Sequence, residues 1–159
     1  MSKRARSNNS RRAPRPIDKQ LKAIKITTAN AAQDATTLIT ATFPGTITGL
    51  RWVLDFSNAD GANGCEYCWA IVHTKDGNDA NDFATSDAAD FYAPEQNVLA
   101  FGLGTLGVTT NGESIASVEG STKTMRKLKQ GDEILFLVKN LGSGTSLKTS
   151  GVVQFFNKT

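Results

Sequence analysis

The sequence predicts an all-β domain, a sandwich or barrel, that follows a short basic arm. Short runs rich in Val, Ile, Phe, Leu and Thr are separated by clusters of Gly, Asn, Asp and Ser, which is typical of strands joined by turns. No long stretch repeats its apolar residues with a helical period. After an arm of residues 1–20, residues 21–159 are enough for one domain with its own core and too few for two.

The predicted strands differ in the clarity of their pattern. The run TITGLRWVLDF alternates with a period of two, which puts four apolar side chains on one face: Leu50, Trp52, Leu54 and Phe56. The run EYCWAIVHT is nearly continuous in apolar residues, and EILFLVKN is a similarly strong strand. The full set of predicted strands is 21–29, 36–43, 46–56, 66–74, 97–104, one or two within 114–128, 133–140 and 152–156.

The arm has an extreme composition. Its opening, MSKRARSNNSRRAPRP, holds six basic residues, no acid and no large apolar side chain after Met1. Such a stretch cannot bury enough surface to offset the entropy of ordering it, so we expect it to be disordered when free.

Charge is divided unevenly along the chain. Residues 1–25 hold nine Lys or Arg against one Asp, a net charge of +8, and residues 26–159 hold nine against fourteen acids, a net charge of −5. A basic segment on an acidic body indicates a polyanionic partner, either nucleic acid or an anionic membrane. Pro14, Pro16 and the lack of apolar residues argue against a membrane-surface helix, a presequence or a secretory signal. No run of 18 apolar residues predicts membrane insertion.

We therefore expect phosphate contacts from the arm and from the basic residues that follow it. These candidate nucleic-acid-binding residues are Lys3, Arg4, Arg6, Arg11, Arg12, Arg15, Lys19, Lys22 and Lys25. The last three are expected where the arm enters the body, on the side that faces this polyanion. The clusters KRAR and RR also fit a nuclear localisation signal. A smaller basic patch is expected from Arg51, Lys123, Arg126, Lys127 and Lys129.

The aromatic residues of the predicted strands are expected to be core and not stacking platforms for bases. Their neighbours are apolar or alternate with polar residues at Trp52, Trp69, Phe101, Phe136 and Phe155.

No group of residues predicts an enzyme, a cofactor or a metal site. The CEYC motif leads into a strand, where residues three apart face opposite ways, so Cys65 and Cys68 are expected to be structural thiols. A zinc site from both cysteines and His73 is the alternative. The acidic loop 75–90 lacks the spacing of an EF-hand, although a looser calcium site stays open. GLGTLG is not followed by a predicted helix, which excludes a dinucleotide fingerprint.

Five stretches resemble the capsid proteins of small circular Rep-encoding single-stranded DNA viruses, the circovirus-like viruses of environmental and marine samples. They are FPGTITGLRW (43–52), CWAIV (68–72), FYAPEQNVLAFG (91–102), STKTMRKLKQGDEILFLVKN (121–140) and VQFFNKT (153–159). The resemblance covers most of the body, and the Arg-rich start matches the arm of that family. It implies a single jelly-roll sandwich of eight main strands and self-assembly into a sixty-subunit, T=1 icosahedral shell.

The resemblance also implies a function. The chain is expected to be a structural protein of the virion whose inward arm binds the single-stranded DNA genome, or RNA after expression in another host, with the host nucleus as the place of assembly. Sixty segments of +8 would offset on the order of 480 phosphates. Two alternatives stay open: a cellular β-barrel protein that binds nucleic acid without sequence specificity, and a lectin-like sandwich with its site in loop 75–90.

Overall fold

The computed structural model describes residues 17–58, 64–74, 98–108, 114–142 and 145–158. Within these residues the chain forms eight strands and no helix. The strands are β1 (Ile17–Thr28), β2 (Gln33–Thr40), β3 (Gly45–Asn58), β4 (Cys65–Thr74), β5 (Val98–Leu106), β6 (Ser114–Leu128), β7 (Glu133–Asn140) and β8 (Leu147–Lys158).

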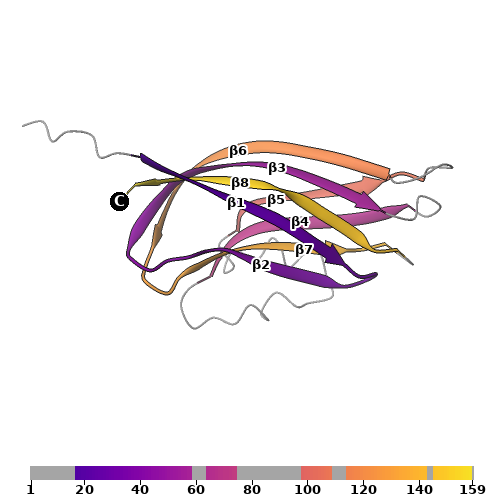
Figure 1. Cartoon of the computed structure of the whole chain (residues 1–159), viewed down its shortest axis with the longest axis horizontal. Coiled ribbons are helices and arrows are strands. Elements are labelled where there is room, and N and C mark those ends of the chain that lie inside the picture. Colours follow the sequence, from indigo (N-terminus) through magenta and orange to yellow (C-terminus); the bar gives the residue numbers. More distant parts are fainter. Residues whose placement is uncertain (1–16, 59–63, 75–97, 109–113, 143–144, 159) are drawn as a thin grey trace, which may run out of the picture.

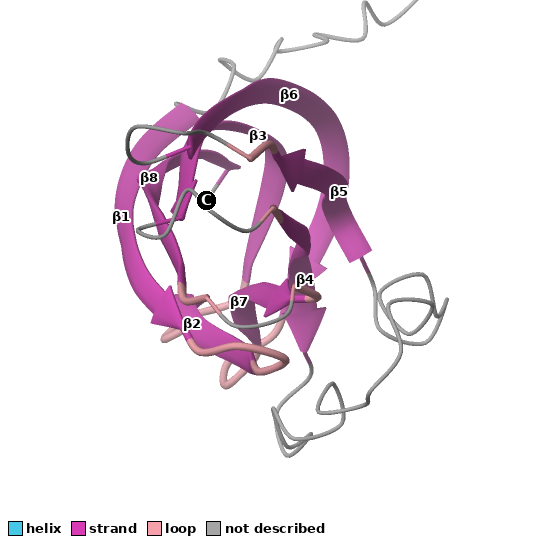
Figure 2. Ribbon diagram, turned by 90° about the vertical axis from the view of Figure 1, so that its right-hand side faces the viewer, coloured by secondary structure: helices cyan, strands magenta, loops and turns pink. Residues whose placement is uncertain are grey.

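The strands form two antiparallel sheets of four, which lie one over the other (Figure 1). One sheet has the order β1-β8-β3-β6 and the other the order β2-β7-β4-β5. Among the eight described strands, only β4 and β5 are consecutive in the chain and neighbours in a sheet; the other consecutive pairs lie in different sheets. The fold is therefore the jelly-roll sandwich that was predicted. Viewed along the strands, the two sheets curve around a common interior (Figure 2).

The interior is filled by the apolar faces of both sheets. Leu50, Leu54 and Phe56 of β3 are buried, as their alternation predicted. Trp52 packs edge-on against Trp69 of β4, with ring centroids 5.6 Å apart, and Phe56 stacks on Tyr67 at 4.2 Å. These pairs join the two sheets, so replacing one of the large rings by a small side chain removes contacts on both sides of the core.

A second apolar cluster lies on the opposite side of β4 and β7. Its members are Cys68, Ala70, Val72, Leu135 and Leu137, all at most 2% exposed. Their neighbours in sequence face the sandwich interior, so both sides of these two strands are shielded from water. This arrangement explains why the two segments are nearly continuous in apolar residues, where β3 alternates.

Several strands extend further than their local pattern predicted. β1 begins at Ile17 and β8 at Leu147, because the two strands pair residue by residue from Ile17–Lys158 to Thr28–Leu147. The last four residues of the predicted arm, 17–20, thus belong to this ladder, and residues 1–16 lie outside the described residues. Residues 114–128 form one strand, since β6 pairs with almost the whole of β3.

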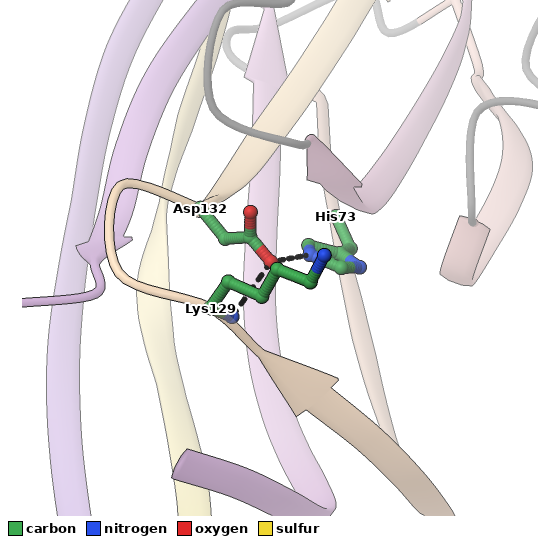
Figure 3. A network of polar contacts seen from close by, with 3 residues as sticks. All are labelled: His73, Lys129 and Asp132. Atoms are coloured by element: carbon green, nitrogen blue, oxygen red, sulfur yellow. Dashed lines mark hydrogen bonds and ion pairs between the residues drawn. The ribbon is translucent and has the colours of Figure 1, made fainter. Parts of the chain in front are cut away.

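A buried polar contact ties β4 to the turn between β6 and β7 (Figure 3). His73 Nε2 lies 2.9 Å from Asp132 Oδ2, and the backbone N–H of Lys129 donates to the same oxygen at 2.9 Å. Gly131 supplies the positive φ of 90° in this turn. The backbone N–H of Gly131 also donates to the carbonyl of Ala41, which follows β2. The contact therefore fixes the ends of several strands relative to one another.

Candidate nucleic-acid interface

The structure separates the predicted lysines of β1. Lys19 and Lys25 are exposed on the outer face of the β1-β8-β3-β6 sheet, together with Ala23. Lys22 alternates to the other face, the one on which Ile24 is buried, and is half-buried. The three lysines do not share a side of the sheet, because their spacing of three residues is odd and strand side chains alternate. The six basic residues of the arm lie outside the described residues.

Cross-strand pairing builds a cationic face on the outside of this sheet. Its positively charged side chains are Lys19, Lys25, Arg51, Lys123, Lys127, Lys148 and Lys158, all exposed. Its carboxylates are Asp55 and Glu119. Seven cations against two carboxylates give a net charge of +5, although the chain from residue 26 onward has a net charge of −5. We call this surface the cationic face.

The positive charge is concentrated at the end of the cationic face where β1 begins. The registers define three rows there: Ile17–Lys158–Thr46–Lys127, Lys19–Phe156–Gly49–Lys123 and Leu21–Gln154–Arg51–Ser121. These rows hold five cations and no carboxylate. The next three rows hold Lys25 and Lys148 against Asp55 and Glu119, so they are neutral. Because residue 17 stands in the first row, the basic arm joins the sheet at its cationic end.

The predicted basic patch is brought together in part. Arg51, Lys123 and Lys127 lie on the cationic face. Arg126 has the opposite parity to its neighbour Lys127 and pairs with Ile47, whose side chain is buried in the interior. Lys129 lies in the turn after β6.

Three residues of the cationic face were missed by the sequence reasoning. Lys148 and Lys158 lie near the two ends of β8, of which the local pattern predicted only the middle. Phe156 follows Phe155, and two adjacent aromatic residues in a strand must face opposite ways. Phe155 is fully buried, so Phe156 takes the outer face and is half-exposed. The two adjacent phenylalanines were therefore the feature of the sequence that could have predicted an aromatic ring on the outer face.

The other aromatic predictions hold with one exception. Trp69, Phe136 and Phe155 are buried, and Trp52 packs against the core. Phe101 is 51% exposed, so the prediction that it belongs to the core is wrong. It lies on β5, the edge strand of its sheet, and alternates with Ala100, which is the buried neighbour. The apolar composition of an edge strand does not show which of two adjacent residues faces inward.

The cysteines are separated as their spacing predicted. Cys65 lies in the sandwich interior and Cys68 in the second cluster. Burial raises the pKa of both thiols, for Cys68 to about 11, and the Cys65 Sγ–H donates to Asn140 Oδ1 at 3.0 Å. Within the described residues no three His, Cys, Asp or Glu side chains could share a metal ion. The thiols therefore have the properties of structural residues, because a reactive cysteine needs a lowered pKa and access.

His73 and Asp132 are the polar pair that most resembles part of a catalytic site, but their surroundings indicate a structural role. Both side chains are buried, and the Nδ1 of His73 has no hydrogen-bond partner among the described residues. A general base must reach the proton it abstracts in a bound substrate, whereas this imidazole is shielded from solvent. The acidic loop 75–90 lies outside the described residues. No helix in the described part of the chain could cross a membrane.

No protein-family model matches the chain, and no curated protein matches it. Solved structures are similar at low identity. A structure of Desmodium yellow mottle tymovirus is 11% identical with a TM-score of 0.39, over 100% of this chain and 97% of that chain. The capsid asymmetric unit of cyanophage Pam1 is 12% identical with a TM-score of 0.41, over 96% of each.

A CocE/NonD family hydrolase from Staphylococcus aureus is 9% identical with a TM-score of 0.44, over 91% of this chain and 33% of that chain. The similar structures thus include viral particles and an enzyme. A fold can host unrelated functions, so these similarities do not decide between functions.

Proposed function

We propose that this chain is a structural capsid protein without enzymatic activity, which assembles into a closed shell of identical copies and binds nucleic acid on one side of that shell. The observation that carries the proposal is the continuity of two cationic regions. Residues 1–16 of the arm hold six basic residues and no acid, and they lead directly to the row where the five clustered cations of the cationic face begin. Both regions therefore meet the same polyanion, by contacts with phosphates that do not depend on sequence.

We expect neighbouring copies to contact each other along the edge of the sandwich formed by β5 and β6. These strands end their respective sheets on the same side of the sandwich (Figure 2). Along this edge Leu103, Val108, Ile115 and Met125 are all at least 63% exposed. Exposed apolar side chains in this number are costly in water and typical of surfaces that another protein covers. Identical copies that bury this edge would remove both the apolar surface and the open strands.

The finer features of the proposal rest on the sequence resemblance given above. They are a T=1 icosahedral shell of sixty subunits, a single-stranded DNA genome, RNA as its substitute after expression in another host, and location in the virion. The KRAR and RR clusters would direct the protein to the host nucleus for assembly.

A cellular nucleic-acid-binding protein is the second candidate, and the cationic face alone is compatible with it. Its expected stacking residues, Trp52 and Trp69, pack against each other in the interior. Such a protein would have to bind through the cationic face as a monomer or a small oligomer.

Electron microscopy of the purified full-length protein, with ultraviolet absorbance of the same sample, tests the proposal. We expect uniform closed particles with the excess absorbance at 260 nm that nucleic acid gives. Deleting residues 2–16 should leave the sandwich folded and lower the nucleic-acid content of the particles. A protein that stays small with added single-stranded DNA would contradict the capsid role, and unchanged nucleic-acid content in the deletion variant would contradict the role of the arm.

The edge can be tested separately. The double variant Leu103→Ser and Met125→Ser should reduce assembly, measured by light scattering, because both side chains are exposed and their loss costs the monomer little. Val152→Ser is the matched control, since Val152 is an exposed apolar residue on β8, which lies between β1 and β3 and is not an edge strand. Equal assembly of the two variants would show that copies do not meet at this edge.

A further inference from the structure

The cationic end of the β1-β8-β3-β6 sheet is hollowed into an open groove of about 590 Å³. The residues that line it include Ile17, Gly49, Arg51, Ser121, Lys123 and Phe156. The groove therefore lies on the cationic face, directly beside the residue at which the arm joins the sheet.

The hollow has a structural cause. The register of β3 shifts between Ile47 and Gly49 relative to both neighbouring strands. Gly49 stands between Phe156 and Lys123 in the second row and has no side chain to fill the surface. A Cβ at this position would lie 3.7 Å from the Phe156 ring and 3.1 Å from the carbonyl oxygen of Thr122. The ring of Phe156 packs beside this glycine, which is buried, whereas Phe156 itself is half-exposed.

Positive charges surround this ring. Lys19 is its partner on β1, Lys158 is two residues further on the same face of β8, and Lys123 lies across Gly49 on β6. Arg51 stands in the adjacent row of β3. Two strand spacings separate Phe156 from Lys123, which is about 10 Å. Among the described residues, no carboxylate lines the groove and neither Arg51 nor Lys123 forms a salt bridge.

We infer that this groove is a binding subsite for one nucleotide of a single-stranded nucleic acid. The base stacks on Phe156, and the phosphates on either side of it contact Arg51 and Lys123. A flat aromatic ring between cations is the arrangement that binds single strands without reading sequence, because every base has a face that can stack. A polyanion without bases would use the cations and leave the ring unused. The inference rests on the proposed function and adds to it a contact with the base.

Phe156→Leu tests the base contact, because leucine keeps an apolar side chain and removes the aromatic face. Binding of a short oligothymidylate and of inorganic polyphosphate to the full chain is measured by competition at several salt concentrations. We expect Phe156→Leu to weaken oligothymidylate binding about fivefold or more and to leave polyphosphate binding unchanged. Phe101→Leu is the control, since Phe101 is an exposed phenylalanine on the other sheet. Thermal unfolding of each variant verifies that the sandwich is intact.

Lys123→Ala tests the phosphate contact. It should weaken binding of both polyanions and reduce the slope of log affinity against log salt by about 0.7 for the oligonucleotide, whereas the control Phe101→Leu on the other sheet should change neither. If the full chain binds no oligonucleotide, the proposed function fails. If it binds and Phe156→Leu is without effect, the subsite alone is wrong and the groove is filled by something else, such as the arm of the same chain.

Discussion

The outer faces of the two sheets differ in almost every property. The cationic face carries seven cations and two carboxylates and exposes most of its side chains. The outer face of the β2-β7-β4-β5 sheet carries Glu66, Glu133 and Lys139, and its centre is the buried cluster of Cys68, Ala70, Val72, Leu135 and Leu137. We call this second surface the apolar face.

The comparison shows how one architecture provides two kinds of surface. Both faces belong to antiparallel sheets that cover the same interior, so the backbone does not distinguish them. The difference lies in the outward residues, which are charged or polar on much of β3 and β6 and apolar in the middle of β4 and β7. A face rich in exposed cations binds polyanions, and a face that is apolar and buried adds to the stability of the sheet.

The strongest contrast is expected from placing one carboxylate on each face. Ala70→Asp puts a charge in the buried cluster, where Ala70 is 0% exposed, and should prevent folding, because a charge buried without a partner costs several kcal/mol. Ala23→Asp places the same charge at an exposed position of the cationic face. Denaturant unfolding should show a change of at most about 0.5 kcal/mol for this control. A folded Ala70→Asp protein would show that the apolar face is open to water.

The next largest effect is expected on binding. The triple variant reverses three charges of the cationic rows: Lys19→Glu, Arg51→Glu and Lys123→Glu. It should lower affinity for single-stranded DNA on the order of a hundredfold at moderate salt, since three phosphate contacts are lost and repulsion is added. Filter binding over a range of salt concentrations measures this change.

The control for charge reversal uses the neutral rows of the same face. Lys25→Glu with Lys148→Glu changes two charges that stand beside Asp55 and Glu119. If this variant loses as much affinity per charge as the triple variant, the charge of the whole domain matters and the cationic end has no special role.

Thiol labelling gives a smaller and finer test of the apolar face. With a pKa of about 11 for Cys68, roughly one thiol in a thousand is ionised at pH 8. Burial also keeps the reagent away from the sulfur atom. Labelling by iodoacetamide, followed by mass spectrometry, should therefore be slow for both cysteines and accelerate as the pH approaches 11. If the apolar face opens before the sandwich unfolds, Cys68 reacts ahead of Cys65, which is enclosed in the interior.

Much of this molecule follows from local sequence. The period of two in residues 46–56 and the apolar runs at 66–74 and 133–140 predict β3, β4 and β7 because burial acts on each residue of a strand separately. The sequence itself also shows the basic arm, and the spacing of three between Cys65 and Cys68 places their side chains on opposite faces of a strand. The ends of β1 and β8 are not, since their polar outer segments are held in the sheet by partners far away in sequence.

The sequence by itself determined an all-β body and a basic arm. Only the tertiary structure decided that the second row aligns Lys19, Phe156, Gly49 and Lys123, contributed by four strands that are widely separated in the chain. Alternation fixes which residues of one strand share a face, but the neighbours of that strand are set by long-range pairing and by the packing of the whole core. For this reason the arm was visible in the sequence, and the cationic face to which it leads was not.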